Sequence, residues 1–166
     1  MNLISILSLA VLLVSIVGVY YIDASATAIA KENGSQAELF QFTTPYYFQA
    51  GDLTAYFSAF FFAFLFSLLF FGFSGIITGV IEGLKFGTIL TSILFTTTAM
   101  YSYVDLLFII PQVFAILAAS TLGQGVINDY HARGNIREEL TTSAKYLAIG
   151  LILTAIFYVI KTNTGA

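Results

Sequence analysis

The chain has 166 residues, of which 58% are hydrophobic and 9% are charged, and its formal net charge is −3. An ordinary water-soluble domain carries about 25% charged residues, so the composition excludes one and indicates an integral membrane protein. The chain has no cysteine, which excludes disulfides and thiolate metal sites, and it has no basic patch that would favour a nucleic-acid partner.

The first predicted span covers residues 3–22, an apolar run that ends in Tyr20 and Tyr21. Tyrosines are typical of the membrane interface. Ala24-Ser25-Ala26 has the small residues of a signal-peptide cleavage site, but the apolar run is long and no basic side chain precedes it. We therefore expect an uncleaved membrane anchor.

Residues 23–52 form the longest polar connection, which we expect to be an external loop. Residues 24–30 are compatible with a helical extension of the first span. Its aromatic cluster, Pro45-Tyr46-Tyr47-Phe48, is predicted to lie at the membrane interface, with a structured cap that docks a partner as the alternative. Thirty residues are too few for a domain core, so we expect residues 1–166 to form a single transmembrane domain.

The second predicted span, residues 53–73, is rich in phenylalanine and begins after Asp52, a typical helix N-cap. Behind it lies a series of glycines at four-residue spacing, here called the glycine ladder: Gly75, Gly79, Gly83 and Gly87, preceded by Gly72. Glycine costs a helix in water about 0.8–1 kcal/mol relative to alanine, whereas in a bilayer it lets a second helix approach closely. We therefore predict helix packing at these five glycines, either within one chain or between copies.

The ladder encloses Glu82 and Lys85, the only charged residues between Asp52 and Asp105, and the sequence allows two interpretations of this segment. In the first, a tight turn at residues 72–75 starts a third span over residues 75–100, which carries both charges inside the membrane. In the second, the preceding helix continues to Ile81 and both charges lie at the interface. Charges near the bilayer centre cost on the order of 2.5–3.5 kcal/mol each, which favours an interfacial position or a buried pair.

A short polar connection at residues 101–105 leads to a fourth predicted span, residues 106–127, with Pro111 near its start. Residues 128–143 form a strongly charged loop, and the spacing of Asn135 and Glu138 predicts that a helix begins there. This helix is expected to continue into the fifth span, residues 145–160. The predicted fold is an all-α polytopic membrane helix bundle of about five transmembrane helices, with a broken helix at the glycine ladder as one alternative.

The distribution of basic residues predicts the orientation, because lysine and arginine favour cytoplasmic loops. With the N-terminus in the cytoplasm, four basic residues fall on the cytoplasmic side and two on the outside. The first group is Lys85, Arg133, Arg137 and Lys145, and the second is Lys31 and Lys161. The loop at residues 128–143 is then cytoplasmic, in a multi-pass protein of the cell (plasma) membrane.

Glu82 and Lys85 are three residues apart, so on a helix they can form an ion pair. They mark either an ion or proton site, with Gln112 as a further polar lining residue, or a self-neutralised pair that fixes a helix end. Two enzyme classes are disfavoured. The sole histidine, His131, lies in a predicted loop, which argues against a histidine-dependent hydrolase, and Asp52 and Asp105 lie at span ends on one outer face, which argues against a paired-aspartate intramembrane protease. We therefore expect no catalytic residues, no metal and no cofactor.

Two segments carry a resemblance to a known family: Glu82-Gly83-Leu84-Lys85-Phe86-Gly87, and Pro111 with Phe114 followed by Ala118-Ala119-Ser120-Thr121-Leu122-Gly123. With the order of anchor, external segment, glycine-punctuated core and final charged-loop helix, they resemble the stage II sporulation protein M family of bacterial and archaeal membrane proteins. The resemblance implies a multi-span membrane fold. For sporulating members it implies a membrane scaffold for peptidoglycan-degrading partners during engulfment.

The chain departs from the family pattern at polar positions: Glu82 replaces the usual asparagine, Gln112 the histidine and Val113 the glycine. We therefore expect a non-enzymatic integral membrane scaffold, or a subunit of a membrane protein assembly. Its expected partners are the lipid bilayer and further copies of itself or other membrane subunits. The alternative is a small transporter or channel subunit with a polar pocket around Glu82 and Lys85.

Overall fold

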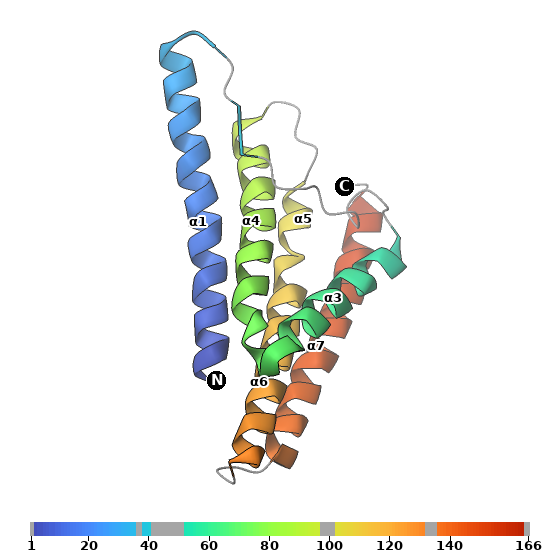
Figure 1. Ribbon diagram of the computed structural model, residues 1–166. Coiled ribbons are helices and arrows are strands. Elements are labelled where there is room, and N and C mark those ends of the chain that lie inside the picture. The colour runs from blue at the N-terminus through green and yellow to red at the C-terminus, as the bar shows by residue number, and fades with distance from the viewer. Residues whose placement is uncertain (1, 36–37, 41–51, 97–101, 132–135, 165–166) are drawn as a thin grey trace.

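The computed structural model describes residues 2–35, 38–40, 52–96, 102–131 and 136–164 (Figure 1). Within these ranges all regular structure is helical, and five helical segments are long and apolar enough to cross a membrane. The predicted all-α membrane bundle is confirmed. The aromatic cluster at residues 45–48, the predicted cap Asn135, Arg133 and the last residues of the third predicted span, 97–100, lie outside the described residues.

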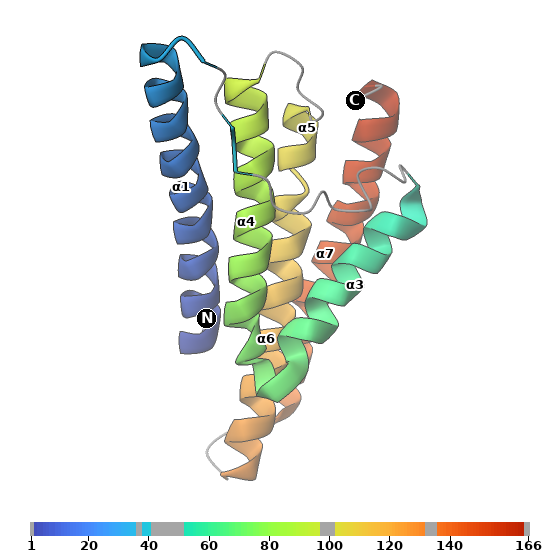
Figure 2. The same ribbon diagram turned by 45° about the horizontal axis from the view of Figure 1, so that its top comes forward.

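The five long helices run in alternating directions along one bundle (Figure 1, Figure 2). They are α1 (Leu3–Glu32), α3 (Leu53–Leu68), α4 (Ser74–Phe95), α6 (Ile109–Tyr130) and α7 (Ile136–Thr164). We call the end at which α1 and α4 begin the N-side, and the end at which α7 finishes the C-side. Helices α4 and α6 run antiparallel, so residue numbers increase toward the C-side along α4 and decrease toward the C-side along α6.

Helices α1 and α7 are longer than the predicted spans because they continue into polar sequence, whereas α3 ends at Leu68, five residues before the predicted end of its span. Helix α1 extends ten residues past position 22, so the first part of the predicted external loop is helical. The connection predicted at residues 101–105 is partly wrong, since Tyr103–Leu106 forms the short helix α5, and Leu107 and Phe108 keep helical torsion angles into α6. Helix α7 begins at Ile136, near the predicted capping signal, so much of the loop predicted at 128–143 is helical.

The chain reverses at the 3-10 turn η1 (Leu69–Gly72), and this decides between the two interpretations of the ladder. The first one is correct in placing a turn before the ladder, although the reversal lies a few residues earlier than predicted. Phe70 and Phe71 adopt left-handed torsion angles, with φ of 51° and 59°, and Gly72 follows with φ of 90°. Left-handed backbone costs a non-glycine residue roughly 1–2 kcal/mol, so tertiary contacts must hold this turn.

Two sets of contacts stabilise the turn. Ser74 Oγ lies 2.5 Å from the carbonyl oxygen of Phe66 and 2.6 Å from that of Leu69, so its hydroxyl donates to carbonyls left free at the end of α3. The turn also packs against α6 at Gly123, where the absence of a side chain lets the Phe71 carbonyl lie directly against the helix. Free carbonyls at membrane depth are thereby covered by protein.

Asp52 caps α3 on the C-side, as predicted, with its carboxylate accepting from the Ala55 amide at 2.7 Å. A hydrogen bond from Thr54 Oγ1 and the one from the Ala55 amide hold the pKa of Asp52 below its ordinary value. Because the pKa is lowered in the folded chain, this cap is present above the carboxyl's ordinary pKa and is lost as the pH falls through the lowered one.

The glycine ladder faces α1, which runs parallel to α4. A Cβ atom placed on Gly83 would lie 2.5 Å from the Leu12 carbonyl oxygen, and one on Gly87 would lie 2.8 Å from Val19 Cβ. Gly75 and Gly79 similarly approach Ser8. Only glycine allows the two backbones to lie this close together, so the ladder face is covered by α1 of the same chain.

On the C-side half, an aromatic core joins α3, α4, α6 and α7. Its buried members are Tyr56, Phe86, Ile89, Phe108 and Phe157. The Tyr56 ring lies 5.2 Å from both the Phe108 and Phe157 rings, and the latter two lie 4.9 Å apart. Edge-to-face and tilted ring pairs of this kind contribute about 0.5–1.5 kcal/mol beyond burial, so this core fixes the C-side half of the bundle.

We predict that Gly83→Ala lowers the thermal unfolding midpoint in detergent micelles, because the added methyl would overlap Leu12 and Ser15 of α1. Overpacking of this kind costs about 1–3 kcal/mol. Gly18→Ala on α1 is the matched control, since a Cβ there has no neighbour within 4 Å among the described atoms. The control should leave the midpoint unchanged or raise it. Equal midpoints for both variants would contradict the α1–α4 contact.

Candidate functional site

Glu82 and Lys85 lie in the middle of α4, as its ninth and twelfth residues of 22. A helix of this length spans about 33 Å, close to the roughly 30 Å thickness of a hydrocarbon core. Both residues therefore lie far from the ends of a helix of membrane-spanning length, and the turn that the second interpretation placed at Glu82 to Lys85 is wrong. Lys85 also drops out of the orientation count, which leaves three basic residues on the predicted cytoplasmic side against two outside.

The two side chains form an ion pair, in which Lys85 Nζ donates to Glu82 Oε1 at 2.8 Å. The Glu82 side chain is 4% exposed and the Lys85 side chain 16% exposed. Among the described residues, the second carboxylate oxygen, Glu82 Oε2, has no hydrogen-bond partner. The pair is thus neutral as a whole but leaves one buried acceptor free.

Gln112 on α6 is the second polar group of this region. It is fully buried, and neither its Oε1 nor its Nε2 atom has a hydrogen-bond partner in the part of the chain that the structure describes. An unsatisfied buried polar group costs about 1–3 kcal/mol. Side chains of this kind need an explanation, and within a membrane they mark candidate functional sites.

The heights of Glu82 and Gln112, measured along the bundle axis, can be compared from a contact that joins their helices. A Cβ on Gly75 would lie 3.7 Å from Cγ2 of Ile116. With a rise of 1.5 Å per residue, Gln112 lies about 6 Å above this contact toward the C-side. By the same rise on the antiparallel α4, Glu82 lies about 10 Å above it. The two polar groups are therefore at neighbouring heights on helices that pack together.

Ser67 on α3 adds a third group that the sequence did not predict. It is fully buried, its Oγ has no partner among the described residues, and its Cβ would lie 3.8 Å from a Cβ on Gly75. Helices α3, α4 and α6 thus each bury polar atoms without partners within about 10 Å of height. We call Ser67, Glu82, Lys85 and Gln112 the central polar site.

Ser67 had only a weak signal in the sequence, as a hydroxyl residue within a run of phenylalanine. The same signal fits serines and threonines that donate to their own helix, as Thr78 does to the Ser74 carbonyl at 3.1 Å and Thr154 to the Gly150 carbonyl at 2.9 Å. Only the tertiary structure distinguishes Ser67 from them, because its hydroxyl makes no such bond among the described atoms.

A second ion pair joins Asp105 and Lys161 on the C-side of the bundle. Asp105 is 2% exposed and also accepts from the Ser102 amide at 2.8 Å, while Lys161 Nζ lies 5.9 Å from the centre of the Tyr56 ring. The pair joins α5 to α7. This pair was not predicted, although both residues lie at span ends on the same predicted outer side, and their opposite charges were the available signal.

On the N-side, polar contacts join α1 to α6. Ser5 Oγ lies 2.6 Å from Ser120 Oγ, with both residues fully buried, and Asn2 Nδ2 donates to the Ser120 carbonyl at 3.1 Å. Gly72 packs against the same turn of α6, since a Cβ there would lie 2.9 Å from Ser120 Cα. The start of α1 and the reversal at η1 therefore meet on one segment of α6.

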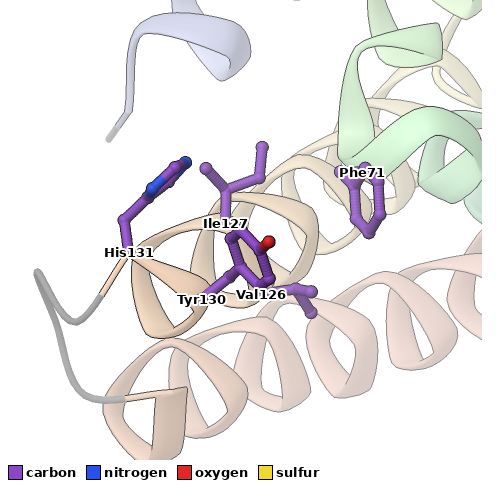
Figure 3. A pocket seen from close by; sticks show the side chains of 5 residues that line it. All are labelled: Phe71, Val126, Ile127, Tyr130 and His131. Carbon is purple, nitrogen blue, oxygen red and sulfur yellow. The ribbon is translucent and has the colours of Figure 1, made fainter.

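A separate apolar cavity of about 360 Å³ lies on the N-side, between η1 and the end of α6 (Figure 3). It is lined by Phe71, Val126, Ile127, Tyr130 and His131. Ile127 is 15 residues from Gln112 along α6, or about 22 Å, so the cavity is not part of the central polar site. The described residues contain no group of three or more His, Asp or Glu side chains placed to hold a metal ion, at His131 or elsewhere.

These features define a multi-pass α-helical membrane protein with a polar site buried among its helices. Comparison of the chain with protein-family models, curated proteins and solved structures gave no match. The resemblance to the stage II sporulation protein M family therefore stays a prediction, and the role of that family is not carried over to this chain.

We predict that Lys85→Met destabilises the protein by about 3–5 kcal/mol, because it leaves the buried Glu82 carboxylate without its counter-charge. The double variant Glu82→Gln with Lys85→Met removes both charges and should recover most of this loss. Thermal unfolding in micelles measures both effects, and Lys31→Met in the exposed last turn of α1 is the control. A Lys85→Met midpoint equal to that of the control would contradict a buried ion pair.

Proposed function

We propose that the chain is a small transporter or channel subunit that carries a monovalent cation, with the Glu82 carboxylate as its binding group. The observation that carries this proposal is the acceptor Glu82 Oε2, buried in the middle of α4 without a partner among the described residues, with the fully buried and equally unpartnered Gln112 amide about 4 Å from it in height on α6. A fold that only needed packing would gain stability by placing apolar residues at these positions. Ionisable groups inside membranes are costly, and a role in a substrate or ion pathway is the usual reason for them.

The donor set favours a cation over an anion. Carboxylate, amide and hydroxyl oxygens, here from Glu82, Gln112 and Ser67, are the ligands that alkali ions and protons take in proteins. Lys85 acts as an internal cation: it neutralises Glu82 at 2.8 Å when no ion is bound, and it must yield that oxygen or share the carboxylate when an ion enters. Because the pair is neutral without an ion, a bound cation adds one net positive charge, which the site avoids only if Lys85 gives up its proton or moves away from the carboxylate.

Transport is favoured over the scaffold hypothesis because of what covers the glycine ladder. The scaffold prediction assigned helix contact with other subunits to the glycine ladder, and partner surfaces to the external loop and the loop at residues 128–143. The four ladder glycines instead contact α1 of the same chain, and Gly72 contacts α6. The strongest sequence feature for assembly is therefore used inside the bundle, whereas the strongest feature for an ion site, Glu82, lies in its interior.

We also propose the cell membrane as the location, with the N-side in the cytoplasm. Arg137 and Lys145, in the first turns of α7, support this orientation because basic residues favour the cytoplasmic ends of spans. Further copies of the chain or other membrane subunits are the proposed protein partners.

The test is flux into liposomes that contain the purified chain. One arm imposes a pH gradient without alkali ions, and the other imposes a sodium or potassium gradient at constant pH, so that the two kinds of cation are distinguished. We expect flux in one arm, a loss of at least tenfold in Glu82→Gln, and a smaller loss in Gln112→Leu. Glu138→Gln, an exposed carboxylate of α7, is the control and should match the wild type.

Two results would overturn the proposal. One is wild-type liposomes with no flux in either arm while the chain co-purifies with a fixed set of membrane proteins, which would favour the scaffold. The other is flux that survives in a folded Glu82→Gln variant. Thermal unfolding of each variant in micelles shows whether a loss of flux is only a loss of fold.

A further inference from the structure

The Glu82–Lys85 pair is electrically neutral, and this limits what the central polar site can bind. Lys85 Nζ donates to Glu82 Oε1 at 2.8 Å, while Glu82 Oε2 has no partner among the described residues. A cation bound at Oε2 would therefore add one net positive charge to the interior of the bundle. Charges without a partner are costly within a membrane, so binding requires that an equal positive charge leaves the site.

Lys85 cannot take this charge out of the membrane by moving its side chain. It is the twelfth of the 22 residues of α4, so about 15 Å of helix separates it from the C-side end and about 16 Å from the N-side start. A four-carbon stem is much shorter than either distance. An ammonium that left Glu82 would thus still be inside the bundle.

Within the part of the chain that the structure describes, α3, α5 and α6 offer Lys85 no second carboxylate within reach. Asp105 on α5 already binds Lys161 and accepts from the Ser102 amide at 2.8 Å. The remaining titratable groups of α3 and α6, with the residue that ends α6, are Tyr56, Asp129, Tyr130 and His131. By the helix rise, the last three lie about 34 Å or more from Lys85 along the bundle axis, toward the N-side.

Asp23 on α1 is the third buried carboxylate of the described chain. Its Oδ1 accepts from the Phe40 amide at 2.6 Å, and its Oδ2 has no partner among the described residues. Because Val19 contacts Gly87 and the two helices are parallel, Asp23 lies one turn higher, about 9 Å above Lys85. Lys85 is also about 160° from Gly87 around α4, on the side away from α1. Loss of its proton is then the remaining way in which Lys85 offsets a bound cation.

We infer that the chain exchanges an alkali cation for a proton, with Lys85 as the group that releases the proton. The inference rests on the proposed function and specifies its cation. Before binding, Glu82 is a carboxylate and Lys85 an ammonium; after binding, the cation lies on the carboxylate and Lys85 is a neutral amine. One Nζ–H bond breaks, its electron pair stays on the nitrogen, and the proton passes to water. One cation is bound for each proton released, so the site is neutral in both states.

The oxygens of the site favour an alkali ion over a proton as the bound species. A proton needs a single oxygen, whereas an alkali ion exchanges its hydration shell for several. Glu82 Oε2, Gln112 Oε1 and Ser67 Oγ are buried oxygens without partners among the described residues. Lysine also fits the exchange, because a buried lysine can lose its proton whereas arginine stays charged in proteins.

The first measurement is proton release on binding. Sodium chloride or potassium chloride is added to the purified protein in weakly buffered micelles, with choline chloride as the control salt, and a pH indicator reports the protons released. We expect release with one of the two alkali salts and none with choline. Lys85→Arg keeps the positive charge beside Glu82 but not the exchangeable proton, so it should show no release. Lys145→Arg, at an exposed position of α7, is the matched control and should behave as the wild type.

The second measurement is coupling in liposomes. A sodium or potassium gradient should drive protons in the opposite direction, and a pH gradient without alkali ions should give no flux. An imposed membrane potential of either sign should leave the initial rate unchanged, because the cycle moves no net charge. Lys85→Arg should lower the rate at least tenfold. The response of the wild type to the potential needs no variant, so the test stays decisive if Lys85→Arg fails to fold in micelles.

Flux that depends on Glu82 but follows the membrane potential and moves no protons would overturn the exchange and leave the proposed function standing. The same holds for proton flux without alkali ions, and for exchange that persists in a folded Lys85→Arg variant. Wild-type liposomes without flux of either kind would overturn the proposed function and the exchange together.

Discussion

The reversal at η1 is the constraint on which the rest of the structure depends. Because α3 ends at Leu68 and α4 begins at Ser74, the ladder and its charges belong to one new helix that crosses the membrane in the opposite direction. Had α3 continued, Glu82 and Lys85 would lie at an interface, where a charged pair needs no explanation. The turn is held by Ser74 on one side and by Gly123 on the other, so two small residues outside the charged segment determine its depth.

The position of Glu82 in the middle of α4 also bears on the role of the glycine ladder. Gly79 and Gly83 lie on either side of Glu82 in sequence, and both bring the α1 backbone within contact distance of α4. A larger residue at either position would separate the helices and expose the flank of the Glu82–Lys85 pair to lipid, where charged groups are costly. Close packing and the buried charge therefore occur in the same segment because the first protects the second.

The five helices could be predicted from sequence because each contains an apolar run of membrane length, a property that depends on composition alone. Their ends could not, because α1 and α7 continue into polar residues, where capping and local propensity decide. The break at Phe70 and Phe71 was also beyond prediction in its position. Neither residue prefers left-handed torsion angles, and the turn is imposed by packing on α6.

The candidate site was predictable only in part. Glu82 and Lys85 are three residues apart, so their pairing follows from helix geometry. Asp105 and Lys161 are separated by 56 residues, and Ser5 and Ser120 by 115, so these contacts require the fold. Gln112 was singled out as a polar residue in an apolar helix, but the absence of partners for its amide among the described atoms is a property of the packed bundle.

Burial along α5–α6 joins these local features into one argument. A helix that only filled a core would present apolar residues at every buried position, whereas Asp105, Gln112 and Ser120 are buried on this segment. Asp105 and Ser120 are explained by their tertiary contacts with Lys161 and Ser5. Gln112 has no such contact among the described residues, and Glu82, about 4 Å from it in height and covered by α1 through the ladder, keeps one acceptor without a partner there. The groups whose burial the packing leaves unexplained are therefore the ones from which a function can be argued.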